Sequence, residues 1–177
     1  MSRSRLAAVA LAAALAVGLT SLFAAAGAPA EPSKSQALFR RTLLGDARTT
    51  PAIKGLLRSG GGFVAPDILF TDLTGDGRSD AVVLIDSGGV AGAVALYVLS
   101  TDGAAQESPL RVVYRSQRLF RAAATTSGGA LILRLPRFAK GDDVCCPKRV
   151  VERVFAWNDH ARTLQLRSSR ELDGPRG

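Results

Sequence analysis

Residues 72–80 place oxygen-bearing side chains at alternating positions, with glycines between them. The oxygen-bearing residues are Asp72, Thr74, Asp76 and Asp80, and the glycines are Gly75 and Gly77. A hard cation such as Ca²⁺ takes six to eight oxygen ligands at about 2.3–2.6 Å, and glycine lets the backbone turn tightly enough to bring them together. The pattern therefore predicts a calcium-binding loop. The alternative is a tight turn whose carboxylates accept backbone N–H hydrogen bonds without a metal.

Over its first nine positions this segment resembles an EF-hand loop, and its strand-loop-strand setting resembles the calcium loops of integrin-type FG-GAP repeats. The resemblance implies side-chain coordination by Asp72, Thr74, Asp76 and Asp80, with Arg78 contributing its backbone carbonyl. Thr74 is a neutral ligand where Asn or Asp is usual, and Val83 stands where an EF-hand has its bidentate Glu. We therefore expect a Kd on the order of 10⁻⁴–10⁻³ M and a structural ion.

Cys145 and Cys146 are the only cysteines of the chain, and they are adjacent. Outside the cytoplasm thiols are usually oxidised, so the intramolecular option is a vicinal disulfide. Adjacent Cα atoms lie only about 3.8 Å apart, below the usual disulfide range, so that ring is expected to be strained. Intermolecular pairing, free thiols and a metal or redox site remain alternatives. A redox role lacks the Cys-x-x-Cys spacing, and a zinc site has only His160 as an imidazole ligand.

Three segments together resemble small exported actinobacterial envelope proteins of the LppP/LprE lipoprotein type. They are residues 72–83, residues 87–89, and residues 141–147 with the following strand that ends at Trp157. The likeness spans about residues 64–168 and implies a cell-envelope protein without naming an activity. The lipoproteins carry a lipidated cysteine near the cleavage site, which this chain lacks, so we expect no lipid anchor.

Positive charge is concentrated late in the chain. Residues 111–170 contain 13 Lys and Arg against four acids, a net charge of +9, whereas residues 31–110 carry a net charge of −2. Aromatic residues interleave with five of the arginines, which are Arg115, Arg118, Arg121, Arg149 and Arg153. They predict a sheet face that attracts an anionic envelope polymer, a lipid head group or another exported protein. The alternative is an ordinary solvated face. We expect no nucleic-acid partner, because no binding motif appears.

The sequence contains little that predicts catalysis. His160 is the only histidine and falls in a polar turn, and the motifs Gly-x-Ser-x-Gly and His-Glu-x-x-His are absent. Asp142 and Asp143 are adjacent, so on a strand they would point to opposite faces. The prediction is a non-catalytic envelope module, monomeric, for binding or structure. A secreted inhibitor acting through the cysteine loop and a hydrolase using the acidic loop's metal are the alternatives.

Residues 1–30 have the three parts of a cleaved signal peptide. Arg3 and Arg5 precede an apolar run from Leu6, and Ala28-Pro29-Ala30 supplies a small-x-small cleavage pattern. An uncleaved anchor is the alternative. The expected location is therefore secreted or within the extracytoplasmic envelope. A chain of 177 residues with a single such run excludes a multidomain enzyme and a polytopic membrane protein.

The elements that position these residues follow from hydrophobic periodicity. Residues 31–62 predict a helical segment, with one helix capped by Ser33 or Ser35 and ending near Gly45, and a second beginning at Pro51. Beyond them the period changes to two, as in strands. The predicted strands are 63–70, 81–86, 93–99, 110–114, 119–123, 130–135, 150–157 and 164–166. This order predicts an α+β domain with one or two N-terminal helices packed on a meandering, mainly antiparallel sheet. Its β-rich part spans residues 63–170, and a flexible tail is expected at residues 171–177.

Overall fold

The computed structural model describes residues 32–101, 109–144 and 146–174. The predicted signal peptide therefore lies outside the described residues. The described part of the chain has two helices followed by two antiparallel sheets, which confirms the predicted α+β class. Across these residues, no helix combines the length and apolar character needed to cross a membrane.

The two helices begin and end where the sequence predicts. Helix α1 spans Lys34–Gly45 and starts with a capping box, in which the Gln36 backbone N–H donates to Ser33 Oγ at 3.2 Å and the Ser33 N–H donates to Gln36 Oε1 at 2.8 Å. Helix α2 spans Pro51–Ser59, with proline at its first position. It ends at Gly60, whose φ of 74° lies in the left-handed region that glycine adopts without strain.

The first sheet contains five strands. They are β1 (Phe63–Val64), β2 (Leu69–Thr71), β3 (Asp80–Asp86), β4 (Ala93–Ser100) and β5 (Arg111–Gln117). Their order is β1-β3-β4-β5, and β2 pairs with β3 on the same edge as β1. The single strand predicted at residues 63–70 is therefore two short ones. They are separated around Pro66, which lacks an N–H for a strand ladder.

The second sheet is a meander of β6 (Ala123–Ser127), β7 (Ala130–Arg137), β8 (Arg149–Asn158) and β9 (Thr163–Asp173). The strand predicted at residues 119–123 begins only at Ala123. The predicted tail is also shorter than expected, because β9 continues to Asp173 and pairs there with Arg149. Gly174 follows with a 2.7 Å hydrogen bond to the Lys148 carbonyl.

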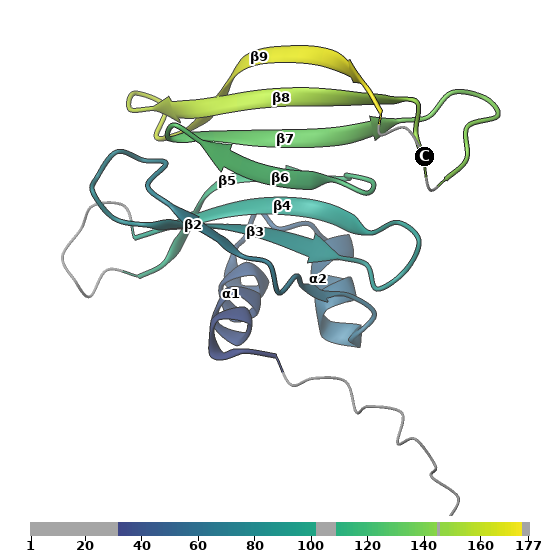
Figure 1. The fold of residues 1–177 in the computed structure, drawn as a ribbon. Helices are drawn as coiled ribbons and strands as arrows, with labels where there is room; N and C mark the ends of the chain where they lie inside the picture. The colour runs from purple at the N-terminus through teal and green to yellow at the C-terminus, as the bar shows by residue number, and fades with distance from the viewer. Residues whose placement is uncertain (1–31, 102–108, 145, 175–177) are drawn as a thin grey trace, which may run out of the picture. The chain divides into compact units, whose positions relative to one another are not determined.

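Two sheets replace the one sheet that was predicted. The chain leaves β5 at Gln117 and turns through Arg118 and Arg121, whose φ values of 64° and 48° are left-handed, before β6 begins in the second layer. Figure 1 shows the helices on one side of the first sheet and the second sheet on its other side. The first sheet is thus covered on both faces, which explains why β3 and β4 are continuous apolar runs.

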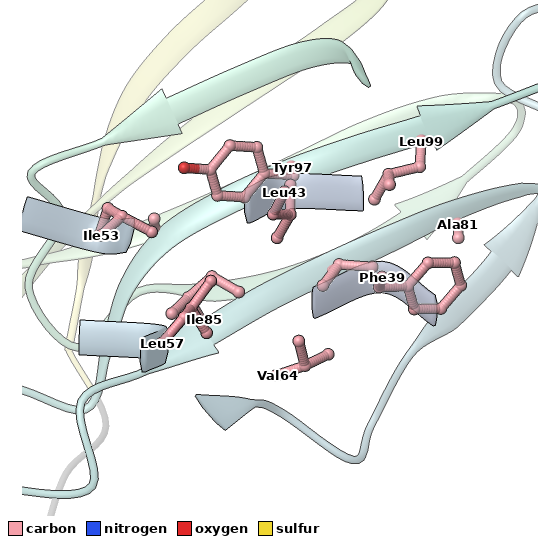
Figure 2. Packing of buried hydrophobic residues seen from close by; sticks show 11 residues of the cluster. Phe39, Leu43, Ile53, Leu57, Val64, Ala81, Ile85, Tyr97 and Leu99 are labelled. Atoms are coloured by element: carbon pink, nitrogen blue, oxygen red, sulfur yellow. The ribbon is translucent and has the colours of Figure 1, made fainter. Parts of the chain in front are cut away.

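Each face of the first sheet contributes to its own core. Figure 2 shows the helix-side cluster, in which Leu43 and Leu57 lie against Ile85 and Tyr97 of the sheet. The cluster between the sheets consists mainly of residues from alternate positions of β3 and β4 and residues of the second sheet: Val82, Leu96, Val98, Leu131, Leu133, Phe155 and Leu164. This packing fixes the second sheet against the first and so positions their edge strands β5 and β9.

Candidate functional site

The acidic loop is held by its own backbone. Asp72 accepts hydrogen bonds from the N–H groups of Gly75 at 2.6 Å and Gly77 at 2.9 Å. Asp80, with 1% of its surface exposed, accepts the N–H groups of Leu73 at 2.7 Å and Thr74 at 2.9 Å on the same oxygen, Oδ2. Gly75 and Gly77 take φ values of 77° and 81°, which the tight path of the loop requires. The hydrogen-bonded turn that the sequence left open is therefore present.

The predicted calcium ligands do not gather into a recognisable metal group. Asp76 is exposed and accepts the Arg78 N–H at 2.9 Å. Within the described residues, no cluster of three His, Cys, Asp or Glu side chains is placed to hold a metal. The hydroxyl of Thr74 is buried without a hydrogen-bond partner in the described part of the chain. Calcium binding stays a prediction, and the hydrogen bonds show what the loop does on its own.

The segment before the cysteines is organised by Asp142. Its Oδ2 accepts the Ala139 N–H at 2.9 Å, and its Oδ1 lies 3.5 Å from Lys148 Nζ. The Ala139 N–H lowers the pKa of Asp142, with Lys148 adding to the effect. Cys145 lies outside the described residues, and the Cys146 N–H donates to the Asp143 carbonyl at 3.1 Å. The vicinal disulfide stays a prediction, and Asp142 serves the loop fold.

The five arginines predicted to form one face come from different elements of the fold. Arg118 and Arg121 lie in the connection after β5, and Arg121 Nη1 donates to the Val144 carbonyl at 2.7 Å. Arg149 bonds Glu171 Oε1 at 2.7 Å, which lowers the pKa of Glu171. Arg153 is exposed on β8, opposite Leu133. The five arginines therefore lie in both sheets and in the connection between them, and their role as a surface for an anionic partner stays a prediction. Arg115 also lines a cleft with three other arginines.

Arg115 lines a cleft of about 540 Å³ where the edges of the two sheets meet. The other arginines of this arginine cleft are Arg48, Arg111 and Arg162. They come from the α1–α2 connection, from β5 and from the β8–β9 turn, which are far apart in sequence. The remaining lining residues are Val112, Val113, Tyr114, Ala161, Thr163 and Leu164. None of these described lining residues is acidic.

A bulge in β5 brings its residues to the arginine cleft. Val112 pairs with Leu99 and Tyr114 pairs with Val98, so Val113 has no partner in β4. The extra residue shifts the alternation of faces, which lets Val112 and Arg115 lie on the helix side although a regular strand would separate them. Tyr114 then faces the second sheet, where its ring lies 5.2 Å from that of Phe155. Burial raises the pKa of its hydroxyl, so Tyr114 is a neutral hydrogen-bond donor.

Arg115 is held by an ion pair with Asp46. Its Nη2 lies 3.4 Å from Asp46 Oδ2, and its side chain is 19% exposed. Its Nε and Nη2 are buried without a hydrogen-bond partner in the described residues, because the contact with Asp46 lacks hydrogen-bond geometry. Buried donors that lack an acceptor cost free energy. The guanidinium is therefore positioned by an ion pair while part of its donor capacity is unused.

The other two walls of the arginine cleft are fastened to β5. Gln117 donates to the Arg48 carbonyl at 3.1 Å and accepts the Thr50 N–H at 2.8 Å, which fixes the α1–α2 connection. Thr163 Oγ1 donates to the carbonyl of the bulged Val113 at 2.7 Å, which ties the start of β9 to the other sheet. Arg162 follows with a φ of 50° and its guanidinium carbon lies 5.8 Å from the Trp157 ring.

The sequence reasoning missed three of the four cleft arginines, because only Arg115 was named. Arg111 and Arg162 fall inside the basic stretch, so the charge count included them without singling them out. Arg48 lies in the acidic first half and carried no signal. His160 is exposed in the β8–β9 turn, as the sequence predicts.

Comparison with protein-family models, with curated proteins and with solved structures gives no match to this chain. The resemblance to LppP/LprE-type envelope proteins therefore stays a prediction, and the site has to be interpreted from its own residues.

Proposed function

We propose that the protein is an exported, non-catalytic module of the cell envelope that binds an anionic partner. The observation that carries the proposal is the arginine cleft, in which four arginines from three segments line one space and the described lining residues include no Asp or Glu. Arginine is suited to such a role because its planar fork donates two parallel hydrogen bonds to a carboxylate or phosphate.

The two loops that the sequence singled out support this role as structural elements. The carboxylates of the acidic loop are engaged by backbone N–H groups, and Asp142 joins the two ends of the segment around the cysteines. Residues that complete a turn are suited to fixing a scaffold. The proposal therefore assigns partner binding to the basic side chains and stability to the loops.

Export provides the setting in which an anionic partner would be met. A cleaved signal peptide would begin the mature chain at Glu31, close to the first described helix. The partner is an anionic envelope polymer, a lipid head group or an acidic surface of another exported protein. N-terminal sequencing of the protein recovered outside the cytoplasm tests this part, and a chain that begins at Met1 would contradict cleavage.

Sedimentation with purified cell envelopes tests the binding part. We expect the exported protein to bind envelopes at low ionic strength and to dissociate as salt is raised, because the Debye length falls from about 30 Å at 0.01 M to about 3 Å at 1 M. A basic protein of unrelated fold and similar net charge serves as the control for non-specific adsorption. Absence of binding, or binding that salt does not weaken, would contradict the proposal.

A further inference from the structure

We propose that the arginine cleft is a binding site for a phosphate group carried on an organic molecule. This inference rests on the proposed function and deepens it, because it names the site and the chemistry of the ligand. The site comprises Arg115 as its anchor, with Arg48, Arg111 and Arg162 on the surrounding walls.

The number and origin of the guanidinium groups favour phosphate. A carboxylate offers two oxygens in one plane, whereas a phosphate ester arranges its oxygens tetrahedrally around phosphorus, with three terminal oxygens in a monoester and two in a diester. Arginines that line the cleft from the α1–α2 connection, from β5 and from the β8–β9 turn lie on different sides of such a group, which suits a tetrahedral anion better than a planar one. Paired guanidinium–phosphate hydrogen bonds are among the stronger ones in proteins.

Arg115 is prepared for such a ligand before the ligand arrives. Asp46 holds its guanidinium at 3.4 Å, and this contact leaves Nε and Nη2 without a hydrogen bond in the described residues. An anion in the cleft lowers the energy of this partly buried cation through attraction at short range. A small rotation of the guanidinium would also give its unused donors an acceptor.

The rest of the cleft suits the organic part of the ligand. Val112, Val113 and Tyr114 are among the lining residues and are only partly buried, so they leave some apolar surface beside the arginines. The volume of about 540 Å³ lies within the range of small-molecule sites, about 300–1,000 Å³, and exceeds what a phosphate group alone would fill. The ligand is therefore expected to be a phosphoester.

The walls are fixed relative to one another, which favours binding of a discrete ligand. The Thr163–Val113 hydrogen bond links the two sheets, and Gln117 links the α1–α2 connection to β5. A site that is already ordered loses less conformational entropy when a ligand binds. A diffuse basic surface would lack these cross-links.

Calorimetric titration of the exported protein with glycerol 3-phosphate tests the inference, with inorganic phosphate and glycerate as comparison probes. We expect saturable binding of one glycerol 3-phosphate per chain, and weaker binding of both comparison probes. Glycerate carries a carboxylate in place of the phosphate, so equal affinity for glycerate would overturn the assignment to phosphate.

Three substitutions and a matched control locate the site. Arg115→Gln and Arg162→Gln are expected to weaken glycerol 3-phosphate binding about tenfold or more, since each removes charged hydrogen bonds. Arg115→Lys is expected to weaken it as well, because lysine keeps the charge and loses the fork. Arg41→Gln removes the same charge from the exposed surface of α1 and should leave the affinity unchanged. Equal loss in Arg41→Gln and Arg162→Gln would overturn the site.

Thermal unfolding of each variant shows whether it is folded. If Arg115→Gln does not fold, Arg162→Gln still tests the site. Competition by poly(glycerol phosphate) and by phosphatidylcholine vesicles with and without phosphatidylglycerol identifies the source of the phosphate. If either competitor displaces glycerol 3-phosphate, the inference is supported. If neither competitor displaces it, the link between the cleft and the envelope is overturned. Salt-sensitive binding to envelopes without saturable glycerol 3-phosphate binding would overturn the cleft inference alone. If the protein binds neither envelopes nor glycerol 3-phosphate, the proposed function is overturned too.

Discussion

Removing the Asp80 carboxylate should destabilise the fold strongly, because one buried and one partly buried backbone donor depend on it. One oxygen of Asp80 accepts the N–H groups of Leu73 and Thr74, and Leu73 is itself only 3% exposed. A buried donor left without an acceptor costs about 1–3 kcal/mol. Leu73 and the only partly buried Thr74, whose donor costs less when unpaired, give an expected loss of about 2–5 kcal/mol for Asp80→Ala, before any effect of the small cavity.

Asp80→Asn and Asp76→Ala provide the matched comparisons. Both hydrogen bonds reach the same oxygen of Asp80, so the single carbonyl oxygen of asparagine can still accept them, and the loss should be clearly smaller. Asp76 is exposed and accepts only the Arg78 N–H among the described hydrogen bonds, so Asp76→Ala should cost at most about 1 kcal/mol.

Denaturant and thermal unfolding, both in excess EDTA, measure these differences. For a domain of this size a loss of about 2–5 kcal/mol corresponds to a fall in Tm of roughly 4–20 °C. EDTA removes any contribution from bound calcium, so the comparison reports the hydrogen bonds alone. If Asp80→Ala unfolds within about 0.5 kcal/mol of the parent protein, a range usual for neutral surface changes, the argument from buried donors is refuted.

Three further predictions concern the remaining loops and the second sheet. Millimolar CaCl₂ should raise Tm relative to EDTA while MgCl₂ does not. At the expected Kd, about 1 mM calcium stabilises the folded state by about 0.4–1.4 kcal/mol, and equal melting in all three solutions would leave the loop a metal-free turn. Hydrogen bonds from Arg170 and then Arg134 lower the pKa of Glu152, so its stabilising effect should be present above the ordinary glutamate pKa of about 4.3 and be lost as pH falls through the lower pKa of the folded state. Glu152→Gln should therefore flatten the acid side of the stability-pH curve, and an unchanged curve would contradict this. Intact mass spectrometry without reductant should find a monomer lighter by one hydrogen molecule than the reduced protein if Cys145 and Cys146 are paired, whereas a disulfide-linked dimer or a reduced mass would refute the vicinal bond.

Local structure followed closely from the sequence because it depends on neighbouring residues. The capping box at Ser33, the proline at the start of α2 and Gly60 after α2 are local signals for where the helices begin and end. Alternation of apolar residues located most strands. Each of these signals depends only on residues that are close together in the sequence, and the tertiary packing of this fold is compatible with them.

The separation into two sheets was not predictable from the same signals. Strands that meander within one layer and strands that change layer have the same period of two, and the change occurs at Arg118 and Arg121, where two arginines adopt left-handed backbone conformations. Such conformations are uncommon for residues other than glycine, asparagine and aspartate. The continuous apolar runs of β3 and β4 were the available clue that the first sheet is covered on both faces.

The candidate site was missed for a related reason, since its arginines share no local pattern. The bulge at Val113 places Arg115 on the same side as Val112, and a tertiary hydrogen bond from Gln117 brings Arg48 to the same place. A count of charges along the chain cannot register either event. It also included arginines that the fold uses elsewhere, such as Arg134 and Arg170, which both bond Glu152 on the second sheet.

The distribution of carboxylates explains why the cleft, and not the whole basic half, is the candidate surface. Glu152 is only 3% exposed and lies between Arg134 and Arg170 on neighbouring strands, while Glu171 bonds Arg149. These pairs neutralise much of the charge along β8 and β9, and exposed ion pairs contribute little to long-range attraction. At the cleft, Asp46 contacts Arg115, and the described lining residues include no carboxylate. A partner drawn by charge would therefore find four arginines together at the junction of the two sheets, where the hydrogen bonds of Gln117 and Thr163 also join the walls of the cleft.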